Sequence, residues 1–213
     1  MMPPLVLYGA GGHARVILDM AALSGLKPDW VVDDHPTKDS LDGFPVIAST
    51  DRRWQDLSQF RFVVAVGRNQ VRSEIFARLL ARGGEPETII HPGAVIARGT
   101  ELGPGSVVMA GVVVNPGTRV GANVILNTCC SVDHDGIIGD HSHLCPGVHL
   151  AGTVQIGRLT LLGTGVSVIP GRTIGSEVTV GAGSVVLRDL PDGCCAFGNP
   201  ARVQRMRPPS SRR

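Results

Sequence analysis

The chain contains few aromatic rings and almost no lysine. Phe, Trp and Tyr make up 4% of the 213 residues, and Lys27 and Lys38 are the only lysines beside eighteen arginines. So few rings suit an interior that is a narrow column of aliphatic side chains. The formal net charge of +2 is also small. The sequence therefore gives no reason to expect a nucleic-acid partner.

Long apolar runs and metal-binding cysteine patterns are absent too. No stretch of 18 apolar residues could form a transmembrane helix, and no signal peptide precedes the first apolar run. We therefore expect a cytoplasmic protein with no membrane partner. None of the five cysteines belongs to a C-x-x-C pair, so reduced, packed thiols are expected rather than zinc or disulfides.

What the chain does contain is an unbroken period of six. Every sixth residue from Ile90 to Val186 is Ile, Leu or Val, over seventeen consecutive positions. The next residue is often Gly, and the residue four positions after the aliphatic one is usually small or β-branched. Such a period predicts a parallel β-helix, in which each hexapeptide forms a short strand and a turn. Glycine is expected to let the chain bend at the corners.

The N-terminal part follows a different pattern. Apolar runs at 5–8, 30–32, 45–47 and 62–66 are separated by helical patterns that start near Val16 and Asn69. This order predicts a small parallel α/β unit of about four strands. We place a Rossmann-like, nucleotide-sugar-binding domain at residues 1–86 and a β-helix domain at 87–206. A basic tail, expected to be disordered, follows at 207–213.

A glycine-rich turn, G-A-G-G-H at 9–13, links the first strand to the first helix. Ala14 takes the third glycine position of the dinucleotide fingerprint, which tolerates Ala there. Glycines at this point let backbone N–H groups approach a phosphate. Asp33 ends the second strand, where an acid can meet a ribose. Because the domain is short for a dinucleotide fold, the pattern favours a nucleotide-sugar site. A purely structural turn is the alternative.

One part of the repeat, at 127–136, is strongly polar. Val132 keeps its inward position, and D-H-D at 133–135 follows at a turn where His134 could project outward. A carboxylate that accepts the imidazole N–H makes the ring more basic, so His134 is a candidate general base. The alternatives are an exposed solubilising turn and a metal site built from three histidines. The metal site, from His141, His143 and His149, would leave the glycine-rich turn unexplained, so no metal is expected.

Five motifs together resemble a known family. They are Y-G-A-G-G-H-A-R-V at 8–16, V-D-D at 32–34, V-A-V-G-R-N at 64–69, N-T at 127–128 and V-D-H-D at 132–135. They resemble the sugar O-/N-acyltransferases of the hexapeptide-repeat class, especially the nucleotide-4-amino-sugar N-acetyltransferases of the bacillosamine and perosamine type. The resemblance implies a left-handed, three-faced parallel β-helix and acetyl-CoA as co-substrate, without a metal. It also implies a homotrimer with active sites between subunits.

The resemblance implies roles for individual residues as well. His134 would be the catalytic base, and Asp135 the acid that raises its basicity. The substrate-binding residues that it implies are Gly11, Gly12, His13, Asp33, Asp34, Gly67 and Asn127. The residues that it implies for acetyl-CoA are His143, Thr164 and Ala182.

The resulting hypothesis is acetyl-CoA-dependent N-acetyl transfer to the 4-amino group of a nucleotide-linked amino sugar. A UDP-4-amino-4,6-dideoxy sugar is the favoured acceptor. O-acetylation of sialic acid or a related sugar would use the same base and stays open. A non-catalytic nucleotide-sugar-binding scaffold is an alternative of another class, but it would have no use for the acids and histidine at 133–135.

Overall fold

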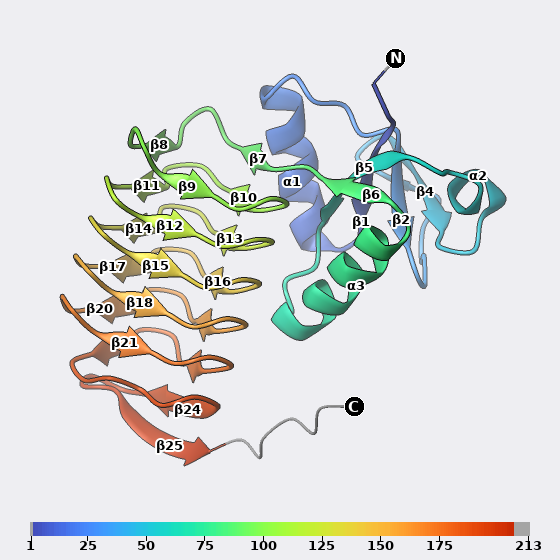
Figure 1. The fold of residues 1–213 in the computed structure, drawn as a ribbon. Helices are drawn as coiled ribbons and strands as arrows, with labels where there is room; N and C mark the ends of the chain where they lie inside the picture. The colour runs from blue at the N-terminus through green and yellow to red at the C-terminus, as the bar shows by residue number, and fades with distance from the viewer. Residues whose placement is uncertain (1, 207–213) are drawn as a thin grey trace.

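The computed structural model describes residues 2–206, which form an α/β domain followed by a long stack of coils (Figure 1). The basic tail expected at 207–213 lies outside the described residues. Within 2–206, no helix combines the length and the hydrophobicity that a membrane span requires. The predicted fold class is confirmed: a Rossmann-like α/β domain precedes a left-handed parallel β-helix.

The α/β domain is built on one sheet with the strand order β3-β4-β2-β1-β5-β6. Its strands are β1 (Leu5–Tyr8), β2 (Trp30–Asp33), β3 (Ser40–Leu41), β4 (Phe44–Ala48), β5 (Phe60–Val64) and β6 (Gly84–Pro86). Its helices are α1 (Gly12–Leu23), α2 (Arg52–Gln55) and α3 (Asn69–Ala81). All neighbouring strands are parallel except β3 and β4. The sequence pattern missed β3 and β6 because both are short, and β6 contains Gly and Pro, which are rare in strands.

Both faces of this sheet are buried. Along β1, Leu5 and Leu7 pack in the core beneath α1, whereas Val6 and Tyr8 pack in the core beneath α2 and α3. A strand covered on both sides reads as a continuous apolar run, which explains the sequence at 5–8. The aromatic rings are concentrated here, since Phe197 is the only one after Phe76.

The β-helix has seventeen two-residue strands that recur every six residues. They are β7 (Ile89–Ile90), β8 (Val95–Ile96), β9 (Glu101–Leu102), β10 (Val107–Val108), β11 (Val113–Val114), β12 (Arg119–Val120), β13 (Ile125–Leu126), β14 (Ser131–Val132), β15 (Ile137–Ile138), β16 (His143–Leu144), β17 (His149–Leu150), β18 (Gln155–Ile156), β19 (Leu161–Leu162), β20 (Ser167–Val168), β21 (Thr173–Ile174), β22 (Thr179–Val180) and β23 (Val185–Val186). Val107 pairs with Ile125, so one coil takes 18 residues. Every third strand pairs in parallel, which gives the prism three sheets and three corners. A hairpin of β24 (Cys194–Phe197) and β25 (Arg202–Met206) ends it.

The period-six aliphatic residues fill the prism. From Val108 to Val186, all of them are buried. The first three differ: Ile90 is 37% exposed, and Ile96 and Leu102 are only partly buried. These three lie in the first coil, which has no preceding coil to cover its open end.

The glycines of the repeat do not act as the sequence suggested. The left-handed turn residue lies three positions after the aliphatic one, as at Gly117 (φ 76°) and Asp135 (φ 57°). Glycines directly after the aliphatic residue avoid this region. At Gly139, an added Cβ would lie 2.5 Å from the backbone nitrogen of Arg158 in the next coil. The interpretation that these glycines bend the chain is therefore corrected: they allow close stacking of the coils.

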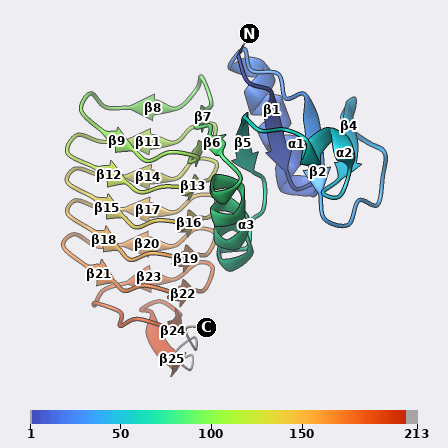
Figure 2. The same ribbon diagram turned by 45° about the vertical axis from the view of Figure 1, so that its right-hand side comes forward.

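A buried arginine joins the two domains. Helix α3 lies beside the prism (Figures 1 and 2), and its Arg72 is fully buried. The guanidinium donates to the carbonyls of Val66 (3.1 Å) and Gly67 (3.2 Å) in the α/β domain. It also donates to the carbonyls of Asn123 (3.2 Å) and His141 (2.7 Å) in the prism. Burial lowers the pKa of Arg72 to about 9. Arg72 thus fixes the loop at Gly67 against the prism.

Replacing Arg72 is expected to loosen this junction. In Arg72→Met, several buried carbonyls lose a charged donor, so the free energy of unfolding should fall by about 3–5 kcal/mol. Arg72→Lys keeps a charge but lacks the planar fork and should recover only part of the loss. Urea unfolding measures both. The control is Arg53→Met, whose exposed pair with Asp51 should contribute little to stability. Equal stability of Arg72→Met and Arg53→Met would contradict the assignment.

Candidate active site

The glycine-rich turn is held in place by Asp33. The backbone N–H of Ala10 donates to Asp33 Oδ2 at 2.8 Å, and His35 N–H donates to Oδ1 at 2.9 Å. Asp33 therefore ties the end of β2 to the turn that precedes α1. Gly11 is the N-cap of α1, and neither a side-chain cap nor an acid occupies its first turn. The N–H groups at 11–13 are thus suited to a phosphate.

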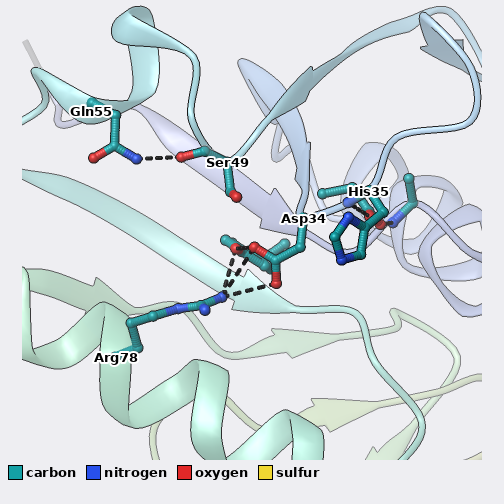
Figure 3. A network of polar contacts seen from close by, with 8 residues as sticks. Asp34, His35, Ser49, Gln55 and Arg78 are labelled. Atoms are coloured by element: carbon teal, nitrogen blue, oxygen red, sulfur yellow. Dashed lines mark hydrogen bonds and ion pairs between the residues drawn. The ribbon is translucent and has the colours of Figure 1, made fainter.

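Asp34 belongs to a separate polar network (Figure 3). Tyr8 donates its hydroxyl proton to Asp34 Oδ1 at 2.5 Å, and Arg78 Nη2 lies 3.2 Å from Oδ2 and 2.6 Å from the Tyr8 oxygen. Partial burial acts to raise the pKa of Asp34, but the hydrogen bonds from Tyr8 and Arg78 hold it below its usual value. Burial, with the hydrogen bond to Asp34, raises the pKa of Tyr8 to about 12.

A cavity of about 260 Å³ opens beside this network. Tyr8, Asp34 and Arg78 line it together with Trp54 and Gln55, whose side-chain amide donates to the carbonyl of Ser49. Tyr8 and Trp54 are almost fully buried in its wall, and the Arg82 guanidinium lies 4.1 Å from the centre of the Trp54 ring, so the cavity offers mainly a carboxylate and cationic donors to a ligand. The cavity can therefore accept a small polar group of a ligand.

His143 connects the α/β domain with one corner of the prism. It lies on the outside of β16 but is only 8% exposed. Its Nδ1 lies 3.3 Å from the carbonyl oxygen of Gly67, and its Nε2 lies 3.1 Å from Asn127 Nδ2. Because Thr128 N–H donates to Asn127 Oδ1, the amide nitrogen of Asn127 faces the ring. The proton of neutral His143 is therefore on Nδ1. Burial, reinforced by the charge of Arg72, lowers its pKa to about 3.

His13 lies next to this group. Its ring centroid is 6.4 Å from that of His143, and burial lowers its pKa to about 4. Its Nε2 is buried and has no hydrogen-bond partner among the described residues. An unpaired buried nitrogen is costly, so this atom is a point where a ligand or a partner chain can bind.

Thr164 and Ala182 lie along the same corner as Asn127. We define the Asn127 corner as the turns at 109–112, 127–130, 145–148, 163–166 and 181–184, which join the sheet of β13 to the sheet of β14. Gly183 N–H donates to the carbonyl of Thr164, so these turns stack directly. The three residues thus form a line along the prism that can follow an extended ligand.

His134 and Asp135 lie on a different corner. We define the His134 corner as the turns at 115–118, 133–136, 151–154 and 169–172, which join the sheet of β14 to the sheet of β15. His134 Nδ1 is 2.9 Å from Asp135 Oδ2, and the two side chains are 58% and 64% exposed. The hydrogen bond to Asp135, aided by the charge of Asp133, raises the pKa of His134. No described residue pairs with Nε2, which can therefore take up a proton.

The predicted residues thus form two groups. His13, Gly67, Asn127 and His143 come together at the Asn127 corner, whereas His134 and Asp135 lie on the next corner of the same coil. No hydrogen bond or ion pair found within residues 2–206 joins the two groups. A single chain therefore presents the two halves of the predicted site on different corners.

Within one chain, the three histidines of the metal alternative do not come together. His141 Nδ1 lies 2.9 Å from Asn123 Nδ2 on the third corner, whose turns join the sheet of β15 to the sheet of β16. His149 Nδ1 lies 2.8 Å from Ser131 Oγ on the sheet of β14. His143 faces the α/β domain. Across 2–206, no group of three or more His, Cys, Asp and Glu side chains could hold a metal ion.

The sequence pattern missed the residues that support the site. Tyr8 and Arg78 flank Asp34 but are 70 positions apart, and Tyr8 reads as the last apolar residue of a strand. Arg72 reads as an exposed charge within a helix. None of the three carries a local signal, because each has partners that lie far away in the sequence.

The chain is similar to known proteins over nearly its whole length. The family model of the PglD N-terminal domain matches residues 4–79. A histidine variant of perosamine N-acetyltransferase from Caulobacter crescentus, solved in complex with CoA and GDP-perosamine, is 39% identical with a TM-score of 0.89, covering 96% of this chain and 98% of that one. The acetyltransferase domain of PglB from Neisseria gonorrhoeae is 41% identical with a TM-score of 0.88, covering 95% and 100%. The chain belongs to the nucleotide amino-sugar N-acetyltransferases of the hexapeptide-repeat class. The predicted family is confirmed.

Curated sequences agree with this family. GDP-perosamine N-acetyltransferase of Escherichia coli O157:H7 is 29% identical, with 96% of this chain and 97% of that protein covered. The first curated relatives, acetyltransferases of Saccharomyces cerevisiae and Staphylococcus aureus, match only locally. The chain spans 30% and 32% of their lengths.

The histidines of the site are expected to titrate very differently. The pKa of His134 should lie above the ordinary value for histidine, whereas His13 and His143 should stay neutral down to about pH 4 and pH 3. Asp135→Asn removes the charge beside His134, so the pKa of His134 should fall toward its ordinary value. Two-dimensional NMR of ¹⁵N-labelled histidine measures these titrations. A His134 that titrates identically in the parent protein and in Asp135→Asn would contradict the pairing.

Proposed function

We propose that this protein transfers the acetyl group of acetyl-CoA to the 4-amino group of a nucleotide-linked amino sugar. One observation carries the proposal: the prism presents an exposed imidazole, His134, that is held by the carboxylate of Asp135. The chain that carries it is similar over nearly its whole length to an enzyme solved with CoA and GDP-perosamine. The α/β domain holds the nucleotide, with its phosphates at 11–13 and its base in the cavity beside Asp34.

His134 acts as the general base. Asp135 accepts the Nδ1 proton of the ring, so Nε2 is the atom that takes a proton from the attacking amine. The thioester supplies the activated acyl group: a C–N bond forms, the C–S bond breaks, and the proton passes to the departing thiolate. No residue needs to form an acyl intermediate. A base at this position contributes about 10²–10⁴-fold to the rate.

The Asn127 corner holds the two substrates together. Asn127 lies at the acceptor, and His143 lies where the acetyl group meets the prism. Thr164 and Ala182, further along the corner, follow the pantetheine chain of acetyl-CoA. The unpaired Nε2 of His13 supports this arrangement, because a bound substrate would pair with it.

We infer that the active site forms between two copies of the chain. One chain presents His134 and the Asn127 group on different corners, so a second copy must bring its His134 corner to the Asn127 corner of the first. In a cyclic arrangement, every chain makes the same two contacts with its neighbours. A homotrimer is such a closed ring and contains three sites.

The nucleotide of the acceptor has two candidates, UDP and GDP. The UDP-linked acceptor favoured by the sequence stays a prediction. Full-length relatives are named for GDP-perosamine, which supports a GDP-linked sugar as an equal candidate. O-acetylation would use the same base on a hydroxyl group.

A thiol-release assay tests the reaction. With acetyl-CoA, we expect rapid release with a UDP- or GDP-linked 4-amino sugar and none with CMP-sialic or free sialic acid. His134→Ala should lower kcat by about 10²–10⁴-fold, whereas His91→Ala, in the first coil, should not. Turnover only on the hydroxyl acceptors would replace N- with O-acetylation. Silence with every acceptor would favour the binding scaffold.

Mixing inactive chains tests the shared site. His134→Ala and Asn127→Ala are each expected to be inactive, but chains co-assembled in equal amounts should recover about a quarter of the activity, since half of the chains carry each intact corner. The control mixes His134→Ala with Asp135→Ala, which damage the same corner and should not complement. If the first mixture stays as inactive as the control, the site does not lie between chains.

A further inference from the structure

One glycine in the prism stands where the fold does not need one. We compare the residues that stand two places after each period-six aliphatic residue. There are seventeen such positions, from Pro92 to Arg188, and sixteen of them carry a side chain. Ala stands there at 110, 122 and 182, so the backbone of this position accepts a Cβ. Gly152 is the single exception. Its φ lies outside the left-handed region, so backbone conformation does not require glycine.

Gly152 lies directly beneath His134 in the next coil. The two positions are 18 residues apart, which is one full coil, and Thr153 N–H donates to the carbonyl of His134 at 2.8 Å. A Cβ built on Gly152 would lie 2.6 Å from Cε1 of the His134 ring and closer still to Nε2. Such separations do not occur between real atoms, so any side chain at 152 would displace the ring.

We infer that Gly152 is a positioning residue: its missing side chain leaves the space in which the His134 ring lies with Nδ1 on Asp135 and Nε2 directed outward. The inference rests on the proposed role of His134 as the base. The ring is otherwise exposed and is fixed mainly by its 2.9 Å contact to Asp135. The backbone at Gly152, which has no side chain, supports the His134 ring on the side of the next coil.

Gly152→Ala tests this role. The added methyl group should push the ring off Asp135, so kcat should fall by about 100-fold, as expected for a misplacement of about 1 Å, whereas KM for both substrates should change little. NMR of the same variant should find the His134 titration moved toward its ordinary value. Thermal unfolding should be nearly unchanged, because Ala occupies this position in other coils. The matched control is Gly93→Ala, which places a Cβ 3.2 Å from Nδ1 of His91 in the first coil and should leave kcat unaltered.

A double variant separates this inference from its alternatives. If Gly152 acts through His134, Gly152→Ala should cost nothing further in a His134→Ala background. A full additional loss there would overturn the inference, since Gly152 would then act by itself. A normal kcat and an unmoved titration in Gly152→Ala would also overturn it, while the proposed function stands if His134→Ala is inactive. A His134→Ala variant with normal kcat would overturn the proposed base itself.

Discussion

The position of the α/β domain on the prism depends on one buried cation. Arg72 donates to backbone carbonyls in both domains, and it is fully buried. A charge in the interior is tolerated only when each donor finds an acceptor, and carbonyls from both sides meet this requirement. The carbonyl of Gly67 also faces His143 Nδ1, so the charge, the loop at Gly67 and the prism form one network. The position of the α/β domain relative to the prism is therefore fixed by hydrogen bonds as well as by the chain connection.

The coil geometry determines which residues can act together. Residues 18 apart stack on one corner, so Asn127 shares its line with turns one, two and three coils away. Residues six apart lie on successive corners instead. Asn127 and His134 differ by seven positions, and this separation places them on different corners of one coil. Two side chains on different corners of one coil do not meet within a single chain, which is the constraint behind the proposed site between two copies.

Burial gives the histidines different chemistry. His143 and His13 are covered where the domains meet, and their pKa values fall to about 3 and 4 because the charged form is poorly solvated. They remain neutral hydrogen-bonding groups over the physiological range. His134 is exposed and bonded to Asp135, so its pKa rises and it can accept a proton. The same type of side chain is thus kept neutral where the domains meet and made more basic at the next corner.

The sequence by itself determined much of the architecture. The aliphatic residues with a period of six specify the prism, because each repeat contributes one strand of two residues and one inward side chain. The apolar runs in the N-terminal part specify a sheet that is covered on both faces. The motif at 133–135 also predicted that a neighbouring carboxylate contacts His134, and the family resemblance pointed to Asp135, which is the partner in the structure. These features were readable because each depends on a short stretch of chain.

Only the tertiary structure decided the rest. Arg72 has the sequence appearance of a surface residue, and its partners lie up to 70 positions away. The network of Tyr8, Asp34 and Arg78 joins two strands and a helix. Gly152 is the one glycine at its position in the repeat, but its relation to His134 follows from the stacking of coils. Such contacts depend on how distant segments pack, and the spacing of residues along one segment carries no record of that packing.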